Sequence, residues 1–225
     1  MARAAIGFAI YLFLTPVVLF WSAGTMAWPE GWAFTALWVM SILVSRLLAW
    51  RRHPDLLRER AKAWGGGEET EADRSLATLA AIFAPLVMVV VSGLDRRLVW
   101  GPGIPSGLRW AAGLGVAFGY GIGAWAMAVN PFFSAVARIQ SDRDQRVITA
   151  GPYRWVRHPA YAGGVLSAVC MPLMLGSIWA LLPSAIMIVM LIIRCVREDK
   201  LLAEGLEGYR AYMARTPYRL LPRIW

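Results

Sequence analysis

The chain has 225 residues, of which 58% are hydrophobic and only 16% are charged, and its formal net charge is +9. A soluble domain carries roughly 25% charged residues, so this composition excludes an ordinary soluble enzyme. The basic residues cluster in loops between long apolar runs, which is typical of membrane proteins and argues against a nucleic-acid-binding protein. The length predicts a single membrane domain over residues 1–225.

Four apolar runs occupy the first part of the chain. Crossing a bilayer takes about 20 mostly apolar helical residues, and each run has this length with Arg46 as its only charged residue. We predict four transmembrane helices within residues 1–129. The first run could instead be a signal peptide cleaved after Ala27, but its long apolar core favours a membrane helix. The runs are Ala4–Ala27, Gly31–Trp50, Ser75–Leu94 and Trp110–Val129.

A fifth run, Pro159–Ile193, is uncharged and too long for one membrane crossing. Pro172, Gly176 and Pro183 interrupt it, and proline and glycine commonly break helices. We therefore predict two helices joined by a tight turn around Leu175–Ile178. The predicted fold is an all-α polytopic membrane helix bundle of about six transmembrane helices, with the last two forming a hairpin.

The distribution of Lys and Arg predicts the orientation. The loop after the second run has six basic residues, residues 130–158 have five, and the segment from Arg194 onward has seven. The turn Trp28–Glu30 has none, and the connection between the third and fourth runs has three. Since basic loops stay on the cytoplasmic side, both termini are expected in the cytoplasm, in a bacterial inner membrane. Acidic residues offset the charge of the second loop, so its Gly65–Gly67 stretch indicates a flexible connector rather than a lipid-binding patch.

The densest polar segment is Gly151–Gly163, directly before the predicted hairpin. Pro159 suits the first turn of a helix, which places His158 at the helix start. Backbone N–H groups at a helix start can bind acceptor or anionic groups. The alternative is membrane anchoring, because Tyr, Trp and Arg also favour the headgroup layer.

A second polar segment follows the hairpin. Arg194 and Glu198 are four residues apart and therefore share a helix face. A hairpin returns the chain to the side where it began, so these two residues should lie close to His158 and Tyr161. Alternatively, the segment is only a basic stop after a membrane helix, followed by an intrahelical ion pair.

Taken together, these motifs resemble the isoprenylcysteine carboxyl methyltransferase family of integral membrane methyltransferases, which share a C-terminal region with phospholipid methyltransferases. Two departures from the family pattern are Asp199, where a second Glu is usual, and a shortened stretch at Leu206–Gly208. The matching segments are Asn130–Ser134, Val147–Tyr153, Arg157–Gly163, Arg194 with Glu198 and Asp199, Gly208 and Tyr209 with Tyr212, and His53–Arg60.

The resemblance implies S-adenosyl-L-methionine as cofactor, in a cytosolic pocket formed by a cofactor-binding and catalytic region at residues 130–225. Glu198 would bind the polar end of the cofactor, and Arg194 would face the methyl acceptor. Arg138 lies where the family often has a different polar contact, so its role is open. The implied catalytic residues are Arg194 and Glu198, and the implied cofactor-binding residues are Gln145, Arg146, Val147, Ile148, Tyr153, His158, Pro159, Ala160, Tyr161 and Glu198.

The implied substrate is a lipophilic acceptor met among membrane lipids, and the reaction is carboxyl O-methylation of an isoprenylcysteine-like group. N-methylation of a phospholipid amine is the alternative within the same group of families. Arg194 favours the carboxylate, because a cation repels a protonated amine.

Three other functions compete. A membrane reductase that uses NADPH has a similar Arg-His-Pro-x-Tyr element, but Ala160 and Gly163–Val165 depart from its pattern. A haem protein needs His inside the membrane, whereas His53 and His158 fall in loops. A transporter would show ionisable residues in mid-membrane. Cys170 and Cys195 form no CxxC pair, which argues against a disulfide framework and a metal site.

Overall fold

The computed structural model describes residues 2–56, 71–134 and 137–225, and these residues form helices and no strand. The all-α prediction is thus confirmed. The Gly65–Gly67 connector and the part of the His53–Arg60 motif after Leu56 lie outside the described residues. In chain order the elements are α1 (Ala2–Ala23), α2 (Pro29–Arg52), α4 (Glu71–Thr78), the π-helical turn η1 (Leu79–Phe83), α5 (Ala84–Leu98), α6 (Ser106–Val129), the short 3₁₀ turns η2 (Ser141–Arg143) and η3 (Gly151–Arg154), α7 (Pro159–Met174), α8 (Leu181–Gly205) and α9 (Tyr209–Arg215).

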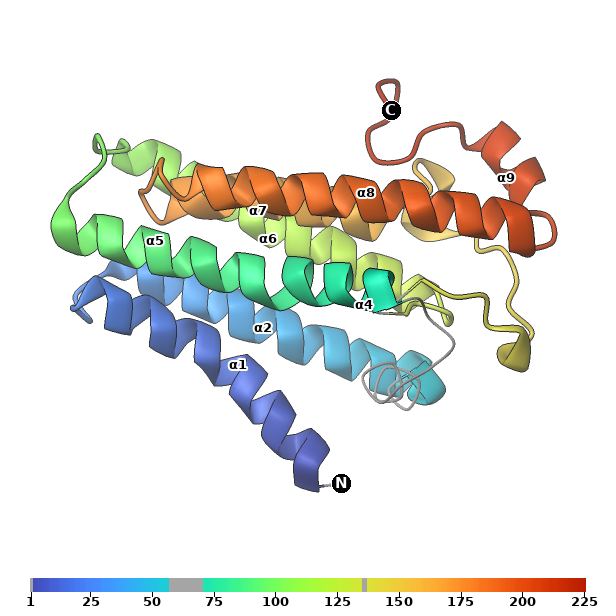
Figure 1. Ribbon diagram of the computed structural model, residues 1–225, viewed down its shortest axis with the longest axis horizontal. Coiled ribbons are helices and arrows are strands. Elements are labelled where there is room, and N and C mark those ends of the chain that lie inside the picture. Colours follow the sequence, from blue (N-terminus) through green and yellow to red (C-terminus); the bar gives the residue numbers. More distant parts are fainter. Residues whose placement is uncertain (1, 57–70, 135–136) are drawn as a thin grey trace.

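The long helices lie roughly antiparallel in a bundle, with α4, η1 and α5 forming one continuous rod (Figure 1). Among the described residues, Pro29–Arg52, Ser75–Leu98 and Ser106–Val129 are long and apolar enough to cross a membrane. Leu12–Ala23 and α7 are shorter apolar helices, and α8 carries its charges only beyond Ile193. Each predicted membrane segment is therefore helical over most of its length, although the first helix ends at Ala23 rather than Ala27, and the fold is that of a membrane helix bundle.

The bundle has two different ends. The turn end, at the left of Figure 1, holds the short connections 24–28, 99–105 and 175–180. The loop end, at the right, holds the long segment 130–158 and the residues after α8. Exposed tryptophans occur near both ends, as in the aromatic belts of membrane proteins. They are Trp21, Trp32, Trp100, Trp110 and Trp179 at the turn end, and Trp50, Trp125 and Trp155 at the loop end.

The hairpin between α7 and α8 forms where the sequence predicts it. Gly176 has a φ of 80°, a left-handed conformation that glycine adopts without steric cost. The N–H of Ser177 donates to the carbonyl of Pro172 over 2.9 Å, which satisfies a carbonyl at the end of α7. The turn thereby directs α8 back toward the level at which α7 begins.

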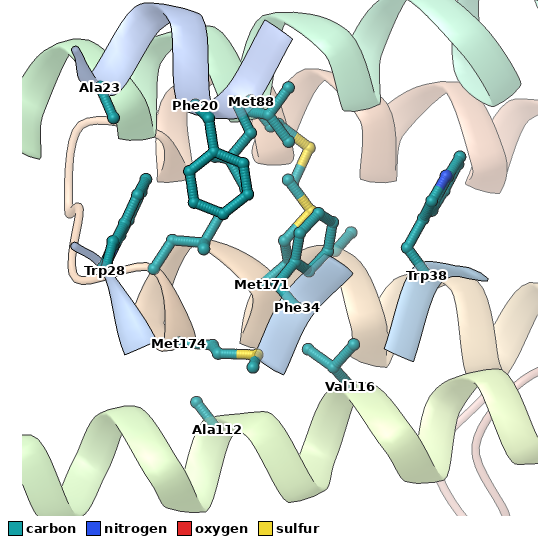
Figure 2. Packing of buried hydrophobic residues seen from close by; sticks show 14 residues of the cluster. Phe20, Ala23, Trp28, Phe34, Trp38, Met88, Ala112, Val116, Met171 and Met174 are labelled. Atoms are coloured by element: carbon teal, nitrogen blue, oxygen red, sulfur yellow. The ribbon is translucent and has the colours of Figure 1, made fainter. Parts of the chain in front are cut away.

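The largest apolar core lies toward the turn end. Side chains from four helices pack together there (Figure 2). They are Phe20 of α1, Phe34 of α2, Met88 of α5 and Met174 of α7, together with Trp28, which directly precedes α2. Nearer the loop end, the backbones of α6 and α7 approach each other closely at Gly119 and Gly163. A methyl group on either glycine would collide with the carbonyl oxygen of the other. The apolar packing thus fixes α7 against its neighbours before the chain reaches the polar loop end.

An ion pair between a buried acid and a half-buried arginine lies at the turn end. Arg109, at the start of α6, contacts Glu30, at the start of α2, over 2.7 Å. One of the three basic residues between the third and fourth apolar runs is thus paired with an acid of the protein. Asp95, buried at the end of α5, accepts a hydrogen bond from the N–H of Gly101 over 2.8 Å. The first contact joins the starts of α2 and α6, and the second holds the connection after α5 against the end of that helix.

Candidate active site

The loop end brings together segments that are distant in the sequence. The last turns of α8, helix α9 and the segment after α6 gather there (Figure 1). Pro159 starts α7, and the N–H of Ala162 is bonded to the carbonyl of His158 over 3.1 Å. A helix leaves its first N–H groups outside the intrahelical pattern. The start of α7 and the end of α8, which carry the polar residues of the hairpin, therefore both lie at the loop end.

Tyr161 is the meeting point of the two predicted polar segments. Its hydroxyl donates to Oε2 of Glu198 over 2.7 Å. The guanidinium carbon of Arg194 lies 5.9 Å from the Tyr161 ring centre, within the range of a cation–π contact. The ring of His158 lies 5.8 Å from the same ring, centre to centre. The structure therefore confirms that Arg194 and Glu198 lie beside His158 and Tyr161.

Asp199 is the centre of a second group of contacts, which sequence reasoning did not assign. Its side chain is only 2% exposed. Arg157 donates to both carboxylate oxygens, from Nε and Nη2, over 2.9 Å each. Nε2 of His158 lies 3.0 Å from Oδ1, the Tyr209 hydroxyl donates to Oδ1 over 2.9 Å, and Nε of Arg219 donates to Oδ2 over 2.9 Å. We call these five residues the Asp199 cluster.

The Asp199 carboxylate is ionised within this cluster. Burial raises its pKa, but hydrogen bonds from His158 and Arg157 outweigh burial and hold the pKa well below the usual range of an aspartic acid. The same carboxylate acts on its neighbours. Burial lowers the pKa of Arg157, but the hydrogen bonds to Asp199 raise it. The net effect is an increase in this pKa. Burial, reinforced by Asp199, raises the pKa of Tyr209, so its hydroxyl stays a donor.

Helix α9 and the residues after it hold the loop that precedes α7. The Tyr212 hydroxyl donates to the carbonyl of Tyr153 over 2.7 Å. Nη1 of Arg157 donates to the carbonyl of Thr216 over 2.8 Å. The Arg157 backbone N–H donates to the carbonyl of Tyr218 over 2.9 Å. The loop that carries the Arg-His-Pro motif is thus fixed from both α8 and the segment after α9.

Tyr153, a predicted cofactor-binding residue, is buried and already engaged. Its hydroxyl accepts a hydrogen bond from Nδ2 of Asn130 over 3.1 Å. Burial raises its pKa, so the hydroxyl is neutral. The Tyr153 side chain thus links the end of α6 to the loop before α7. Its backbone carbonyl is bonded to Tyr212 of α9, which holds this loop in place beside the site.

The predicted cofactor-binding stretch Gln145–Ile148 lies in the irregular segment between η2 and η3. Oε1 of Gln145 accepts a hydrogen bond from the N–H of Gln140 over 2.6 Å. Arg146 is exposed, whereas Val147 and Ile148 are half-buried. A side chain placed at Gly208 would lie 4.0 Å from Val147, so the stretch passes close to the start of α9. Among the described contacts, none joins these residues to Glu198.

The remaining predicted positions are at the start of α7 and in the preceding segment. Pro159 is fully buried and Ala160 is half-buried in the first turn. Arg138 forms an ion pair with Asp142 over 2.9 Å, which keeps it in its own loop. His53 is also engaged, since its Nε2 lies 3.1 Å from the carbonyl of Ala128 and links the ends of α2 and α6.

Residues 108–207 match the phospholipid methyltransferase family. This is the family of integral membrane methyltransferases that includes the isoprenylcysteine carboxyl methyltransferases, so the resemblance seen in the motifs is confirmed. No curated protein matches the chain.

The family match covers somewhat less than half of the chain, from the first turn of α6 to just before α9. It includes His158, Tyr161, Arg194, Glu198 and Asp199, so the joined polar residues of α7 and α8 lie within it. The match indicates a membrane methyltransferase and lends no support to a reductase. The sequence identified Asp199 as the second acid of a family motif but gave no indication of its partners.

Proposed function

We propose that this protein transfers a methyl group from S-adenosyl-L-methionine to the carboxylate of a lipophilic, isoprenylcysteine-like acceptor at the cytosolic face of the membrane. The observation that carries the proposal is the arrangement of Arg194 and Glu198 on either side of Tyr161. It offers one acid for the cofactor and one cation for an acidic acceptor within a single group of contacts. Methyltransferases of the matched family generally use this cofactor.

The side chains present fit S-adenosyl-L-methionine by their chemistry. The half-buried carboxylate of Glu198 suits the amino group or the hydroxyls of the cofactor. The Tyr161 ring suits a sulfonium, since cations are attracted to aromatic faces by about 1 kcal/mol. The first turn of α7, which begins at Pro159, suits a carboxylate through its N–H groups.

The charge balance of the site favours an anionic acceptor. Arg157, Arg194 and Arg219 stand against only two carboxylates, Glu198 and Asp199, among the residues joined by the contacts above. Arg194 is only 7% exposed, and a partly buried guanidinium attracts a carboxylate more strongly than it would in water. A protonated amine in the same position would be repelled.

The residues of the chain contribute binding and orientation to the reaction. When bound, the cofactor supplies a methyl group carried on a sulfonium. Arg194 holds the acceptor carboxylate ionised, so no general base is required. One carboxylate oxygen forms a bond to the methyl carbon as the carbon–sulfur bond breaks, and the electron pair of that bond stays on sulfur. Because the opposite charges of the two reactants disappear, a site that excludes water favours the reaction.

The location explains why the acceptor would be lipophilic. The Arg194–Glu198 turn of α8 follows directly after the apolar part of the helix, which ends at Ile193. An acceptor with a hydrocarbon tail can keep the tail among lipids while its charged head reaches Arg194. In the proposed orientation, the loop end and both termini lie in the cytoplasm, in agreement with the excess of Lys and Arg there.

The name of the matched family favours a second candidate, N-methylation of a phospholipid amine. The two reactions give chemically different products, because a carboxyl methyl ester releases methanol in alkali and an N-methyl group does not. We therefore suggest incubating the purified protein in lipid nanodiscs with methyl-labelled S-adenosyl-L-methionine. Farnesylcysteine and a phosphatidylethanolamine would be offered separately.

Base-labile label on farnesylcysteine, lost in Arg194→Ala but kept in Arg197→Ala, is the expected result. Arg197 lies on the same helix and is exposed, so it controls for the loss of one positive charge. Base-stable label on the phospholipid would instead establish the amine methyltransferase. If both acceptors stayed unlabelled while the cofactor was bound, the substrate class would be wrong.

A further inference from the structure

The segment Thr216–Trp225 lies beyond the matched family region, yet it contacts the Asp199 cluster directly. We propose that Arg219 is a positioning residue for the cofactor site. Through Asp199, it holds this segment against the start of α7 and thereby fixes the geometry in which Tyr161 and Glu198 meet the cofactor. The inference rests on the proposed function.

Backbone hydrogen bonds join the segment Thr216–Trp225 to the loop that directly precedes α7. The N–H of Arg157 donates to the carbonyl of Tyr218, and the N–H of His158 donates to the carbonyl of Arg219, both over 2.9 Å. These two consecutive bonds stand immediately before Pro159, where α7 starts. A shift of the segment would therefore move the two residues that precede the helix.

Arg219 is the link between the segment and α8. Its Nε donates to Oδ2 of Asp199, and its guanidinium lies 5.2 Å from the centre of the Trp225 ring. The carbonyl of Trp225 accepts hydrogen bonds from the N–H groups of Arg219 and Leu220, at 2.9 and 3.0 Å. The segment is thus a closed loop with its own contacts, and Arg219 joins it to the buried acid.

The Asp199 cluster and the Tyr161–Glu198 pair are mechanically coupled. Glu198 and Asp199 are neighbours on α8, and His158 contacts both Asp199 and the Tyr161 ring. Any change in the distance between the start of α7 and this turn of α8 must alter the Tyr161–Glu198 contact. Catalytic sites tolerate little displacement, since a shift of about 1 Å can cost roughly 100-fold in rate.

Arg219 can be removed without leaving a buried charge unpaired. Its side chain is 31% exposed, whereas that of Arg157 is 3% exposed. Asp199 would retain both hydrogen bonds from Arg157 and that from Tyr209. Replacing Arg219 therefore tests the position of the segment, while the other four residues of the cluster keep their contacts with one another.

The experiment compares Arg219→Ala and Arg219→Lys with the wild type and with Arg215→Ala, using the full chain in nanodiscs. Arg215 is an exposed arginine in the last turn of α9. The dissociation constant of S-adenosylhomocysteine is measured by calorimetry well below the unfolding temperature, which is determined separately without ligand. Because Arg219 acts on the ligand only through Asp199 and its side chain is partly exposed, Arg219→Ala is expected to raise the dissociation constant about fivefold, less than loss of a direct contact would. Arg219→Lys should recover part of the loss, and Arg215→Ala should match the wild type.

The outcomes separate this inference from the proposed function. If the wild type binds S-adenosylhomocysteine and Arg219→Ala binds it equally well, Arg219 has no positioning role. The same conclusion follows if only the unfolding temperature falls, or if Arg215→Ala weakens binding as much as Arg219→Ala does. If the wild type does not bind the ligand, the proposed function itself is wrong, and this inference fails with it.

Discussion

Glu198 and Asp199 are adjacent on α8 but serve different partners. Glu198 is half-buried and accepts a hydrogen bond from Tyr161, whereas Asp199 is 2% exposed and accepts hydrogen bonds from Arg157 and Arg219. The exposed part of Glu198 leaves it able to bind a ligand, while Asp199 is enclosed by its own contacts. This division supports the proposed roles, in which Glu198 binds the ligand and Asp199 holds the site in position.

Tyr161→Phe should weaken cofactor binding without unfolding the protein. The change removes the hydroxyl that donates to Glu198 but keeps the ring beside Arg194. Loss of one hydrogen bond to a carboxylate corresponds to about 1.5–3 kcal/mol, so calorimetry with S-adenosylhomocysteine should show roughly 10- to 100-fold weaker binding. Tyr218→Phe is the control, because Tyr218 contacts the same loop through its backbone carbonyl. Equal affinity in Tyr161→Phe and the wild type would show that this contact does not order Glu198.

Arg194→Gln should separate turnover from cofactor binding. Glutamine keeps a polar side chain, longer than alanine and shorter than arginine, but lacks the charge proposed to hold an acceptor carboxylate. We expect the rate of ester formation to fall at least about 100-fold, as when a positioning charge is lost from a reacting group, with an unchanged dissociation constant for S-adenosylhomocysteine. The measurement is labelled-methyl transfer alongside calorimetry. Loss of cofactor binding in this variant would place Arg194 in the cofactor site instead.

The Asp199 cluster should lose its stabilising effect in acid. The pKa of Asp199 in the folded protein lies below that in the unfolded chain, because His158 and Arg157 outweigh the effect of burial. Its contribution is therefore fully present above about pH 4 and is lost as the pH falls below that value. Asp199→Asn should unfold at a lower temperature than the wild type at pH 7, and the difference should narrow toward about pH 3.

The control for this pH series is Asp144→Asn, since Asp144 is exposed in a left-handed turn that asparagine tolerates. Its unfolding temperature should follow that of the wild type at every pH. A difference between Asp199→Asn and the wild type that stays constant from pH 7 to about pH 3 would contradict the assignment of an ionised Asp199.

The ion pair at the turn end should affect stability but not cofactor binding. Arg109→Ala leaves Glu30 buried without its partner, and because Arg109 is partly exposed the loss should be smaller than the about 3–5 kcal/mol of a fully buried pair. The double variant Glu30→Gln with Arg109→Gln should recover much of this loss. Thermal unfolding in detergent measures both effects. Weakened binding of S-adenosylhomocysteine by the folded double variant would show that the two ends of the bundle are coupled.

The positions of the helices could be predicted from the sequence because long uncharged runs have few alternatives in a membrane. The hairpin followed from Pro172 and Gly176, and it brought Arg194 and Glu198 beside Tyr161 as expected. The Asp199 cluster could not be predicted in this way. It depends on Arg219, which no periodicity relates to Arg157, and on the path of the segment after α9.

The sequence also could not indicate which predicted residues are already occupied by internal contacts. Tyr153 and Gln145 match family positions, but the Tyr153 hydroxyl bonds to Asn130 and the Gln145 side chain to Gln140. Such contacts depend on how irregular loops fold back on themselves, and loops carry no repeating pattern. Their cofactor-binding roles stay predictions, and the same binding measurements can test them in variants of Tyr153 and Gln145.

The central claim is that Glu198 binds the cofactor of a methyltransferase. Its most direct test is equilibrium binding of S-adenosylhomocysteine and, separately, NADPH to the purified protein, with Glu198→Ala beside the wild type and Glu204→Ala as control. Glu204 is an exposed acid on the same helix, paired with Lys200 over 3.8 Å. We predict that the wild type and Glu204→Ala bind S-adenosylhomocysteine but not NADPH, and that Glu198→Ala loses this binding while remaining folded. Unchanged affinity in Glu198→Ala would contradict the site, and binding of NADPH alone would contradict the methyltransferase.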